Sequence, residues 1–176
     1  MRVLASITRP SHLTGGGDGI LAIVLLASLA GLVAAFAGQY VFGLQPCILC
    51  LYERLPWALA AVTSAVALAG RTGIGPRLPI VLCAAVFGIG SALAFFHVGV
   101  EQHWWGSIAG CSGGPVSGLG LQDLSAAALA EPIRPCDQVD WRLFGLSLAG
   151  YNAIVSMVLS LGCLVGLRRM KRKRGT

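Results

Sequence analysis

Charged side chains are scarce in this 176-residue sequence. Asp, Glu, Lys and Arg together make up 11% of the residues, against roughly 25% in a typical soluble domain. A soluble fold of this size could not cover its surface with so few charges. Hydrophobic residues make up 56%, which excludes a disordered chain, because disorder requires low hydrophobicity. The sequence therefore predicts an integral membrane protein with a single domain, residues 1–176.

The usual motifs for a bound electron carrier are also missing. The sequence has no C-x-x-C-H haem attachment site, no cysteine cluster suited to an iron–sulfur centre and no convincing dinucleotide-binding fingerprint. Any redox chemistry of this chain would therefore need an electron acceptor of another kind.

Four apolar runs are present instead, and they are uncharged except for Glu53 and Arg54 near the start of the second. A helix needs about 20 mostly apolar residues to cross the hydrocarbon core of a bilayer. The runs cover about residues 20–42, 51–70, 78–98 and 144–167. We expect an all-α membrane protein, a bundle of four transmembrane helices. The first run is longer than the apolar core of a signal peptide, so we expect it to remain as an uncleaved span.

The charged residues predict the orientation of these spans. Most of the 13 basic residues lie before the first run, between the second and third, or in the tail at 168–176, whereas six of the seven acidic residues lie on the opposite side. The positive-inside rule then puts both termini in the cytoplasm and two loops, about 43–50 and 99–143, in the periplasm. The basic tail is explained as a topology signal and lipid anchor, without nucleic-acid binding.

The long second loop has three parts. It opens with the aromatic pair Trp104-Trp105, which suits the membrane interface. The stretch Gly106–Gly120 is rich in Gly and Ser and is expected to be flexible. Leu121–Ala130 predicts a short helix lying along the membrane surface.

Cysteine placement is the most informative feature of the sequence. Two of the six cysteines fall inside the third and fourth runs, where we expect small, buried apolar side chains. The other four fall in the outward loops, where disulfides are permitted if that side is oxidising. These four are Cys47, Cys50, Cys111 and Cys136.

The first two of these form a C-x-x-C pair at the predicted start of the second span. Pro46 precedes Cys47 and suits the first turn of a helix. A helix start favours a thiolate through its free N–H groups and dipole. Arg54 follows Cys50 by four residues, so both lie on one helix face, where a cation could stabilise a thiolate or an electron-rich ligand.

The loop cysteines leave three interpretations open. Two thiol pairs on one side can exchange through mixed disulfides, so Cys111 and Cys136 could relay electrons to the membrane-edge pair and on to a membrane-soluble acceptor such as a quinone. They could instead form one static disulfide that braces a loop. The outward thiols, with His97 or His103, could also hold zinc or copper in a binding or transport protein, although the spacing favours neither metal.

The stretch Gln39–Arg54 reads QYVFGLQPCILCLYER. It resembles the signature region of the DsbB family, and so do the four spans, the two-cysteine second loop and the basic tail. The resemblance implies a quinone-linked thiol oxidase of the bacterial inner membrane. Members reoxidise a soluble thioredoxin-like dithiol protein, DsbA, in the periplasm and pass the electrons to ubiquinone or menaquinone.

The resemblance also implies roles for individual residues. Cys111 would be attacked by the partner and form the mixed disulfide. Cys136 would be its loop partner, able to rearrange onto Cys47, and Cys50 would be the thiolate that faces the quinone.

Four further positions are implied at the quinone. Arg54 would support the quinone and the thiolate charge, and His97 would lie near the quinone. Gln39 matches a family position, and Glu101 stands where some members have glutamine. No resident metal is expected from the resemblance.

Overall fold

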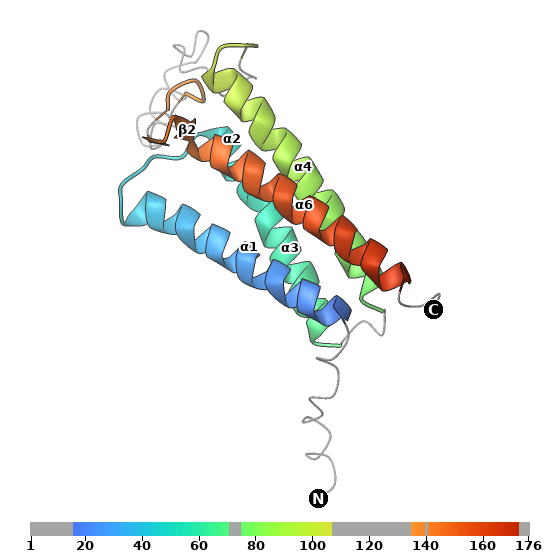
Figure 1. Ribbon diagram of the computed structural model, residues 1–176. Coiled ribbons are helices and arrows are strands. Elements are labelled where there is room, and N and C mark those ends of the chain that lie inside the picture. The colour runs from blue at the N-terminus through green and yellow to red at the C-terminus, as the bar shows by residue number, and fades with distance from the viewer. Residues whose placement is uncertain (1–15, 71–74, 107–134, 140, 173–176) are drawn as a thin grey trace, which may run out of the picture.

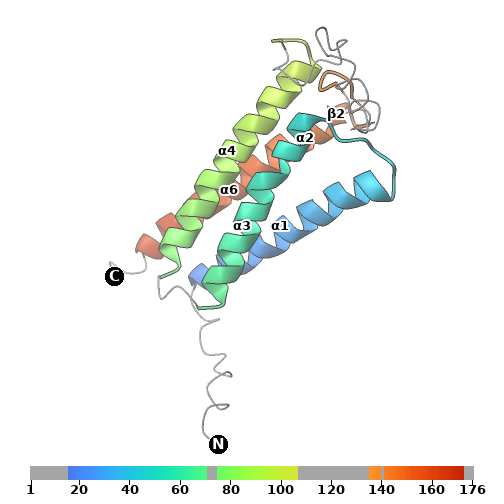
Figure 2. The same ribbon diagram turned by 180° about the vertical axis from the view of Figure 1, so that it is seen from behind.

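The computed structural model describes residues 16–70, 75–106, 135–139 and 141–172. This part of the chain is mostly helical (Figures 1 and 2). Its helices are α1 (Gly16–Tyr40), α2 (Ile48–Tyr52), α3 (Arg54–Leu68), α4 (Arg77–Glu101) and α6 (Leu148–Arg172). Its two short strands are β1 (Arg142–Leu143) and β2 (Leu146–Ser147).

Three helices are long and apolar enough to cross a membrane: α1, α4 and α6, with 25 residues each. Twenty-five residues extend over about 37 Å at 1.5 Å per residue, which exceeds the thickness of the hydrocarbon core. The membrane-protein prediction is therefore confirmed for these three spans.

The second predicted span, 51–70, is divided in the structure. The helix breaks at Glu53 into α2 and the 15-residue α3. Pro56 lies in the first turn of α3, where a residue without a backbone N–H is tolerated, whereas a continuous helix would lose a hydrogen bond there. The fourth crossing stays a prediction.

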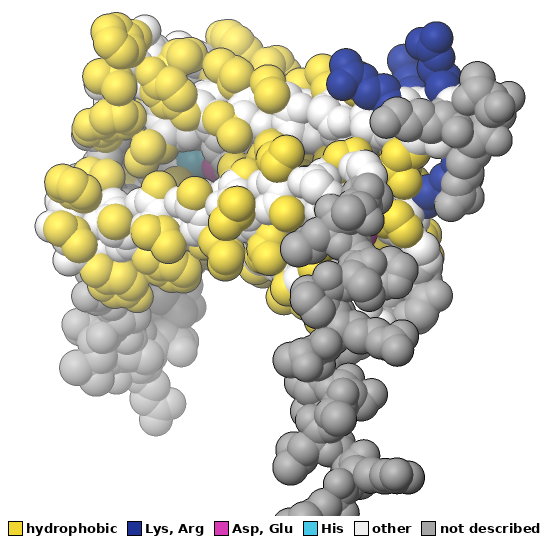
Figure 3. Space-filling model, turned by 60° about the horizontal axis from the view of Figure 1, so that its bottom comes forward, with side chains coloured by type: hydrophobic (Ala, Val, Ile, Leu, Met, Phe, Trp, Pro, Cys, Tyr) yellow, Lys and Arg dark blue, Asp and Glu magenta, His cyan; other side chains and the backbone are white. Residues whose placement is uncertain are grey.

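The helices run alongside one another. The start of α1, the end of α3, the start of α4 and the end of α6 meet at one end of the bundle, and α2 and the strands lie at the other end (Figures 1 and 2). The basic side chains Arg169, Lys171 and Arg172 fall in the last turn of α6. Lys and Arg gather at one end of the space-filling view, while hydrophobic side chains are spread along the described helices on that face (Figure 3).

Close packing between helices depends on small residues. A Cβ on Gly31 of α1 would lie 2.5 Å from the ring of Trp57 of α3, so only glycine allows this approach. The cysteines predicted to be buried in the spans, Cys83 and Cys163, are both buried in the core between α1, α3, α4 and α6, as expected.

Two helices have ends that differ from those of the apolar runs. α4 continues past residue 98 to Glu101. α6 begins at Leu148, later than the run that starts at 144, because a hairpin precedes it in which Arg142 pairs with Ser147. Phe144 and Gly145 form its turn with φ of 49° and 81°, the left-handed values of a type I′ hairpin.

The second predicted loop, 99–143, is described only at its two ends. Cys111 and the predicted helix Leu121–Ala130 lie outside the described residues, and so does the Gly-rich stretch after Gly106.

Candidate functional site

The C-x-x-C pair lies at the start of α2. Cys47 is the N-cap residue of α2, and its sulfur accepts a hydrogen bond from the backbone N–H of Cys50 at 3.3 Å. The two sulfur atoms are 3.1 Å apart, and both residues are free thiols, so the structure represents the reduced pair. Cys47 is buried, and Cys50 is partly buried.

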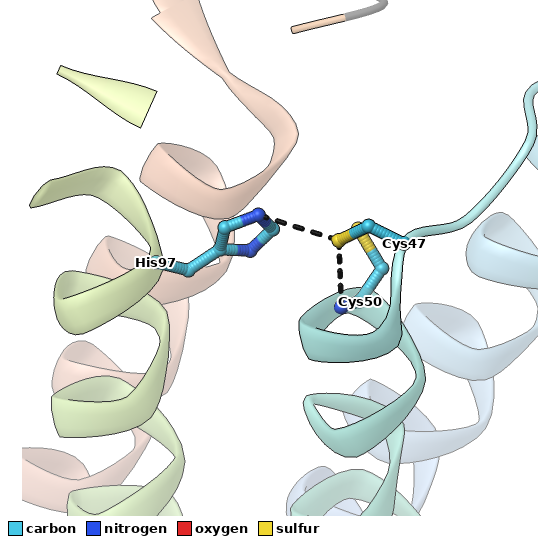
Figure 4. A group of neighbouring side chains, drawn as sticks. All are labelled: Cys47, Cys50 and His97. Atoms are coloured by element: carbon cyan, nitrogen blue, oxygen red, sulfur yellow. Dashed lines mark hydrogen bonds between the residues drawn. The ribbon is translucent and has the colours of Figure 1, made fainter. Parts of the chain in front are cut away.

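An imidazole from α4 faces this pair. The Nε2 atom of His97 lies 3.5 Å from the sulfur of Cys47 (Figure 4). The other ring nitrogen, Nδ1, lies 2.7 Å from Oε1 of Glu53. His97 is 3% exposed and Glu53 is 7% exposed. The imidazole is thus held between a sulfur and a buried carboxylate, a geometry in which both ring nitrogens can donate when His97 is charged.

The second oxygen of the Glu53 carboxylate is held by α6. The Nδ2 group of Asn152 donates to Oε2 of Glu53 at 2.7 Å. The amide oxygen of Asn152 in turn accepts from Nε1 of Trp57 at 2.9 Å and from the hydroxyl of Ser156 at 3.1 Å. Donors from different helices therefore fix the carboxylate, which in turn orients the imidazole.

Sequence reasoning did not single out Glu53 or Asn152 as site residues. A signal for each was present: Glu53 is an acid at the edge of a predicted span, and Asn152 is a polar residue within an apolar run. Ionisable and polar groups at such depth are costly, and they commonly mark functional sites.

The two thiols of the reduced pair differ in acidity. The hydrogen bond shared with Cys50 lowers the pKa of Cys47 to about 4; burial opposes this shift, and His97 adds to it. The same shared proton raises the pKa of Cys50, and burial and the neighbouring charges raise it further. The lowered pKa of Cys47 favours a thiolate on this sulfur in the reduced pair, mainly through the hydrogen bond with Cys50 and also through His97. The family resemblance implies that Cys50 is the thiolate that faces the quinone, and this role stays a prediction.

Arg54 begins α3 and points toward α1. Its Nη1 group donates to Oε1 of Gln39 at 2.7 Å, and its guanidinium carbon lies 5.0 Å from the centre of the Phe36 ring. The guanidinium of Arg54 is therefore held in place by a hydrogen bond to Gln39 and by a cation–π contact with Phe36. These contacts link the start of α3 to the C-terminal half of α1.

Glu101 lies one helical turn after His97. Its Oε1 is 3.9 Å from Nε2 of His97, and its other oxygen accepts a hydrogen bond from Ser147. The hydroxyl of Ser147 also accepts from the backbone N–H of Gly150 at 3.2 Å. The end of the β-hairpin thus holds a second buried carboxylate beside the imidazole.

A cavity of about 570 Å³ joins these groups. Its polar lining includes six of the residues predicted as site residues from the sequence: Gln39, Cys47, Cys50, Arg54, His97 and Glu101. Its apolar wall includes small residues of α1, namely Ala27, Ala30, Gly31, Ala34 and Ala35. A cavity with an apolar wall, two free thiols and a few convergent polar groups is typical of a binding site for a small, mostly apolar molecule.

The loop cysteine that the structure describes lies close to this pair. Cys136 is disulfide-bonded and 1% exposed. It belongs to the same buried cluster as Cys47, Leu49 and Val100. The structure therefore brings a disulfide sulfur into the same packed cluster as the C-x-x-C pair.

The sequence was also compared with known protein families and with named proteins. The family model for disulfide bond formation protein DsbB matches residues 18–166. Disulfide bond formation protein B of Marinobacter nauticus is 31% identical over 156 residues, which cover 85% of this chain and 92% of the relative. The protein of the same name from Albidiferax ferrireducens is 29% identical over 162 residues, covering 88% of this chain and 90% of the relative.

A third relative, also named disulfide bond formation protein B, comes from Xylella fastidiosa. It is 32% identical over 141 residues, covering 74% of this chain and 79% of the relative. No solved structure matches the chain significantly. The family model covers most of the sequence, and the chain therefore belongs to the DsbB family, as a multi-pass membrane protein of disulfide bond formation.

Proposed function

We propose that this chain is a quinone-dependent protein-disulfide oxidoreductase of the bacterial inner membrane. It reoxidises a periplasmic, DsbA-like dithiol protein and passes the electrons to ubiquinone or menaquinone. The observation that carries the proposal is the clustering of disulfide-bonded Cys136 with Cys47, whose C-x-x-C partner lines the cavity. Family membership supports a role in disulfide bond formation. The mostly apolar cavity beside the thiols supports a quinone as the electron acceptor.

The first exchange takes place in the second loop. A thiolate of the soluble partner attacks Cys111, a mixed disulfide forms, and Cys136 leaves as a thiolate. The partner's second thiolate then attacks the partner sulfur that is bonded to Cys111, and Cys111 is released as a thiolate. The partner gains a disulfide, and the two loop cysteines gain its two electrons.

The second exchange joins the loop to the C-x-x-C pair. When Cys47 and Cys50 are joined in a disulfide, the thiolate of Cys136 attacks Cys47 and Cys50 leaves as a thiolate. Attack of Cys111 on Cys136 then restores the loop disulfide and releases Cys47. Burial of Cys136 and Cys47 in one cluster favours this exchange, because the reacting sulfurs need little movement to meet.

His97 and Glu53 stabilise the Cys47 thiolate and hold a proton next to it in this step. Cys47 leaves as a thiolate that faces Nε2 of His97, while Nδ1 faces the carboxylate of Glu53. An imidazolium held between two anions stabilises the leaving thiolate and keeps a proton beside the cavity. A stabilised reduced form makes the disulfide a stronger oxidant.

A bound quinone would supply the oxidising power by taking up two electrons and two protons. Gln39, Arg54 and His97 would contact its polar ring, and the small residues of α1 would leave room for its apolar part. Arg54 contributes a fixed positive charge beside Gln39, and Glu101 contributes a second carboxylate near the imidazole.

The test separates the two exchanges by substrate. Purified Cys47→Ser and Cys50→Ser variants should fail to reduce a soluble benzoquinone with either a small dithiol or a DsbA-like protein as reductant. Cys111→Ser and Cys136→Ser variants should lose only the reaction with the protein. Normal quinone reduction by the Cys50→Ser variant would contradict the proposal.

A further inference from the structure

The reduced C-x-x-C pair and His97 also have the arrangement of a metal site. One ligand atom from each of Cys47, Cys50 and His97 lies within 4.8 Å of the others. Two thiolates and an imidazole are ligands that Zn²⁺ prefers, and three protein ligands with one open position are common in zinc sites. The electron-transfer role uses the contact between Cys47 and His97, but it does not require the sulfur of Cys50 to lie within 4.8 Å of the same imidazole.

The distances fit tetrahedral zinc. Bond lengths of about 2.3 Å to sulfur and about 2.0 Å to nitrogen put a sulfur and a nitrogen ligand about 3.5 Å apart, and two sulfur ligands about 3.8 Å apart. The structure has 3.5 Å between the sulfur of Cys47 and Nε2 of His97. The two sulfurs are 3.1 Å apart and would have to separate slightly, which rotation of the Cys50 side chain can supply.

The groups around the ligands are also suited to a metal. A histidine that binds zinc usually donates its other ring N–H to a carboxylate, which fixes the ring and raises its basicity. Glu53 occupies that place at Nδ1 of His97 and is itself held by Asn152. Nε2 is thereby left facing the sulfurs, as a ligand would be.

A second carboxylate lies beside the imidazole. Oε1 of Glu101 is 3.9 Å from Nε2 of His97, but Glu101 does not belong to the group of ligand atoms that lie within 4.8 Å of one another. The three ligands of the site are therefore Cys47, Cys50 and His97.

We propose that the reduced Cys47–Cys50 pair, together with His97, binds one zinc ion, and that this form cannot transfer electrons. The disulfide form of the pair lacks both thiolates, so metal binding and oxidation exclude each other. Soft divalent metal in the periplasm would then trap the reduced centre and stop turnover. This site is independent of Cys111 and Cys136, unlike a site made of four outward thiols.

The test uses the full-length Cys111→Ser/Cys136→Ser protein, reduced and freed of quinone under anaerobic conditions. Equilibrium dialysis against Zn²⁺, followed by elemental analysis, should find one zinc per chain. Titration with Co²⁺ should give the intense absorption of thiolate-to-cobalt charge transfer. Both signals should disappear after chemical oxidation with diamide, a control that needs no further substitution.

Variants test the ligands one by one. Adding Cys47→Ser should abolish stoichiometric binding, and adding Glu53→Gln should weaken it by roughly 10–100-fold through the loss of the outer partner of His97. Absence of stoichiometric metal in the reduced protein would overturn the proposal, and so would binding that survives oxidation or the Cys47→Ser substitution. Metal-free wild-type protein is assayed for quinone reduction in parallel, so failure of the metal site is distinguished from failure of the oxidase function.

Discussion

Substitution of Glu53 by glutamine should raise the pKa of Cys47 in the reduced protein. The wild-type carboxylate accepts one hydrogen bond from His97 and one from Asn152, each at 2.7 Å. A glutamine amide of the same size has no negative charge, and its NH₂ group would face one of these two donors. The imidazole of His97 would then lose its negatively charged neighbour, and the thiolate of Cys47 would be stabilised less by the imidazole.

The magnitude follows from the loss of a buried, charge-assisted contact. A hydrogen bond to a charged group contributes about 1.5–3 kcal/mol, and one pKa unit corresponds to about 1.4 kcal/mol. Glu53→Gln should therefore raise the pKa of Cys47 by roughly one to two units. The Glu53 carboxylate acts on the Cys47 thiolate only through the His97 ring that lies between them. The expected rise in the pKa of Cys47 is therefore closer to the lower end of this range.

The assay is a short pulse of iodoacetamide on the reduced, quinone-free protein at a series of pH values. Mass spectrometry of the peptides then gives the extent of alkylation at Cys47 and Cys50 separately. The Glu101→Gln variant is the matched control, because Glu101 does not donate to or accept from the His97 ring by a hydrogen bond of normal length. A Cys47 profile with the same midpoint in Glu53→Gln and wild type would refute the reasoning.

Three further results are expected. Asn152→Leu leaves the Nε1 group of Trp57 and a buried carboxylate oxygen without their partner, and should lower the free energy of unfolding by about 1–3 kcal/mol in detergent; an unchanged value would contradict the network. Gly31→Leu should destabilise the protein and reduce quinone turnover, since its Cβ meets the Trp57 ring, whereas Gly19→Leu meets nothing within 4 Å and should do neither. Folding lowers the pKa of Cys47 to about 4, so the resulting stabilisation of the reduced protein is complete above the ordinary thiol pKa and is lost as the pH falls toward 4. The reduction potential of the pair should then change by about 30 mV per pH unit near neutrality, one proton for two electrons, and a slope of about 59 mV would argue against a thiolate.

The sequence predicts the spans because the bilayer demands long apolar runs, and composition alone reveals them. It also predicts which cysteines lie in the core, as Cys83 and Cys163 do. The hairpin before α6 was missed because its strands have two residues each and its turn contains Phe144 where Asn or Asp usually signals such a turn.

The site was only partly predictable from the sequence. The C-x-x-C pair and Arg54 form a local motif, which spacing reveals. The contacts of Glu53 with His97 and Asn152 join residues 44 and 99 positions apart, so no local pattern encodes them. Only the family resemblance implied a place for His97 at the quinone, and the structure supplies the carboxylate of Glu53 that orients the imidazole.

The central claim is that electrons from an exported dithiol protein reach a quinone through the C-x-x-C pair. The most direct test is an anaerobic reaction of purified wild-type protein with a reduced DsbA-like substrate and a limiting amount of ubiquinone or menaquinone. The account predicts one disulfide formed per quinone reduced, and no quinone reduced by Cys50→Ser. Disulfide formation without stoichiometric loss of quinone, or none at all with either acceptor, would contradict it.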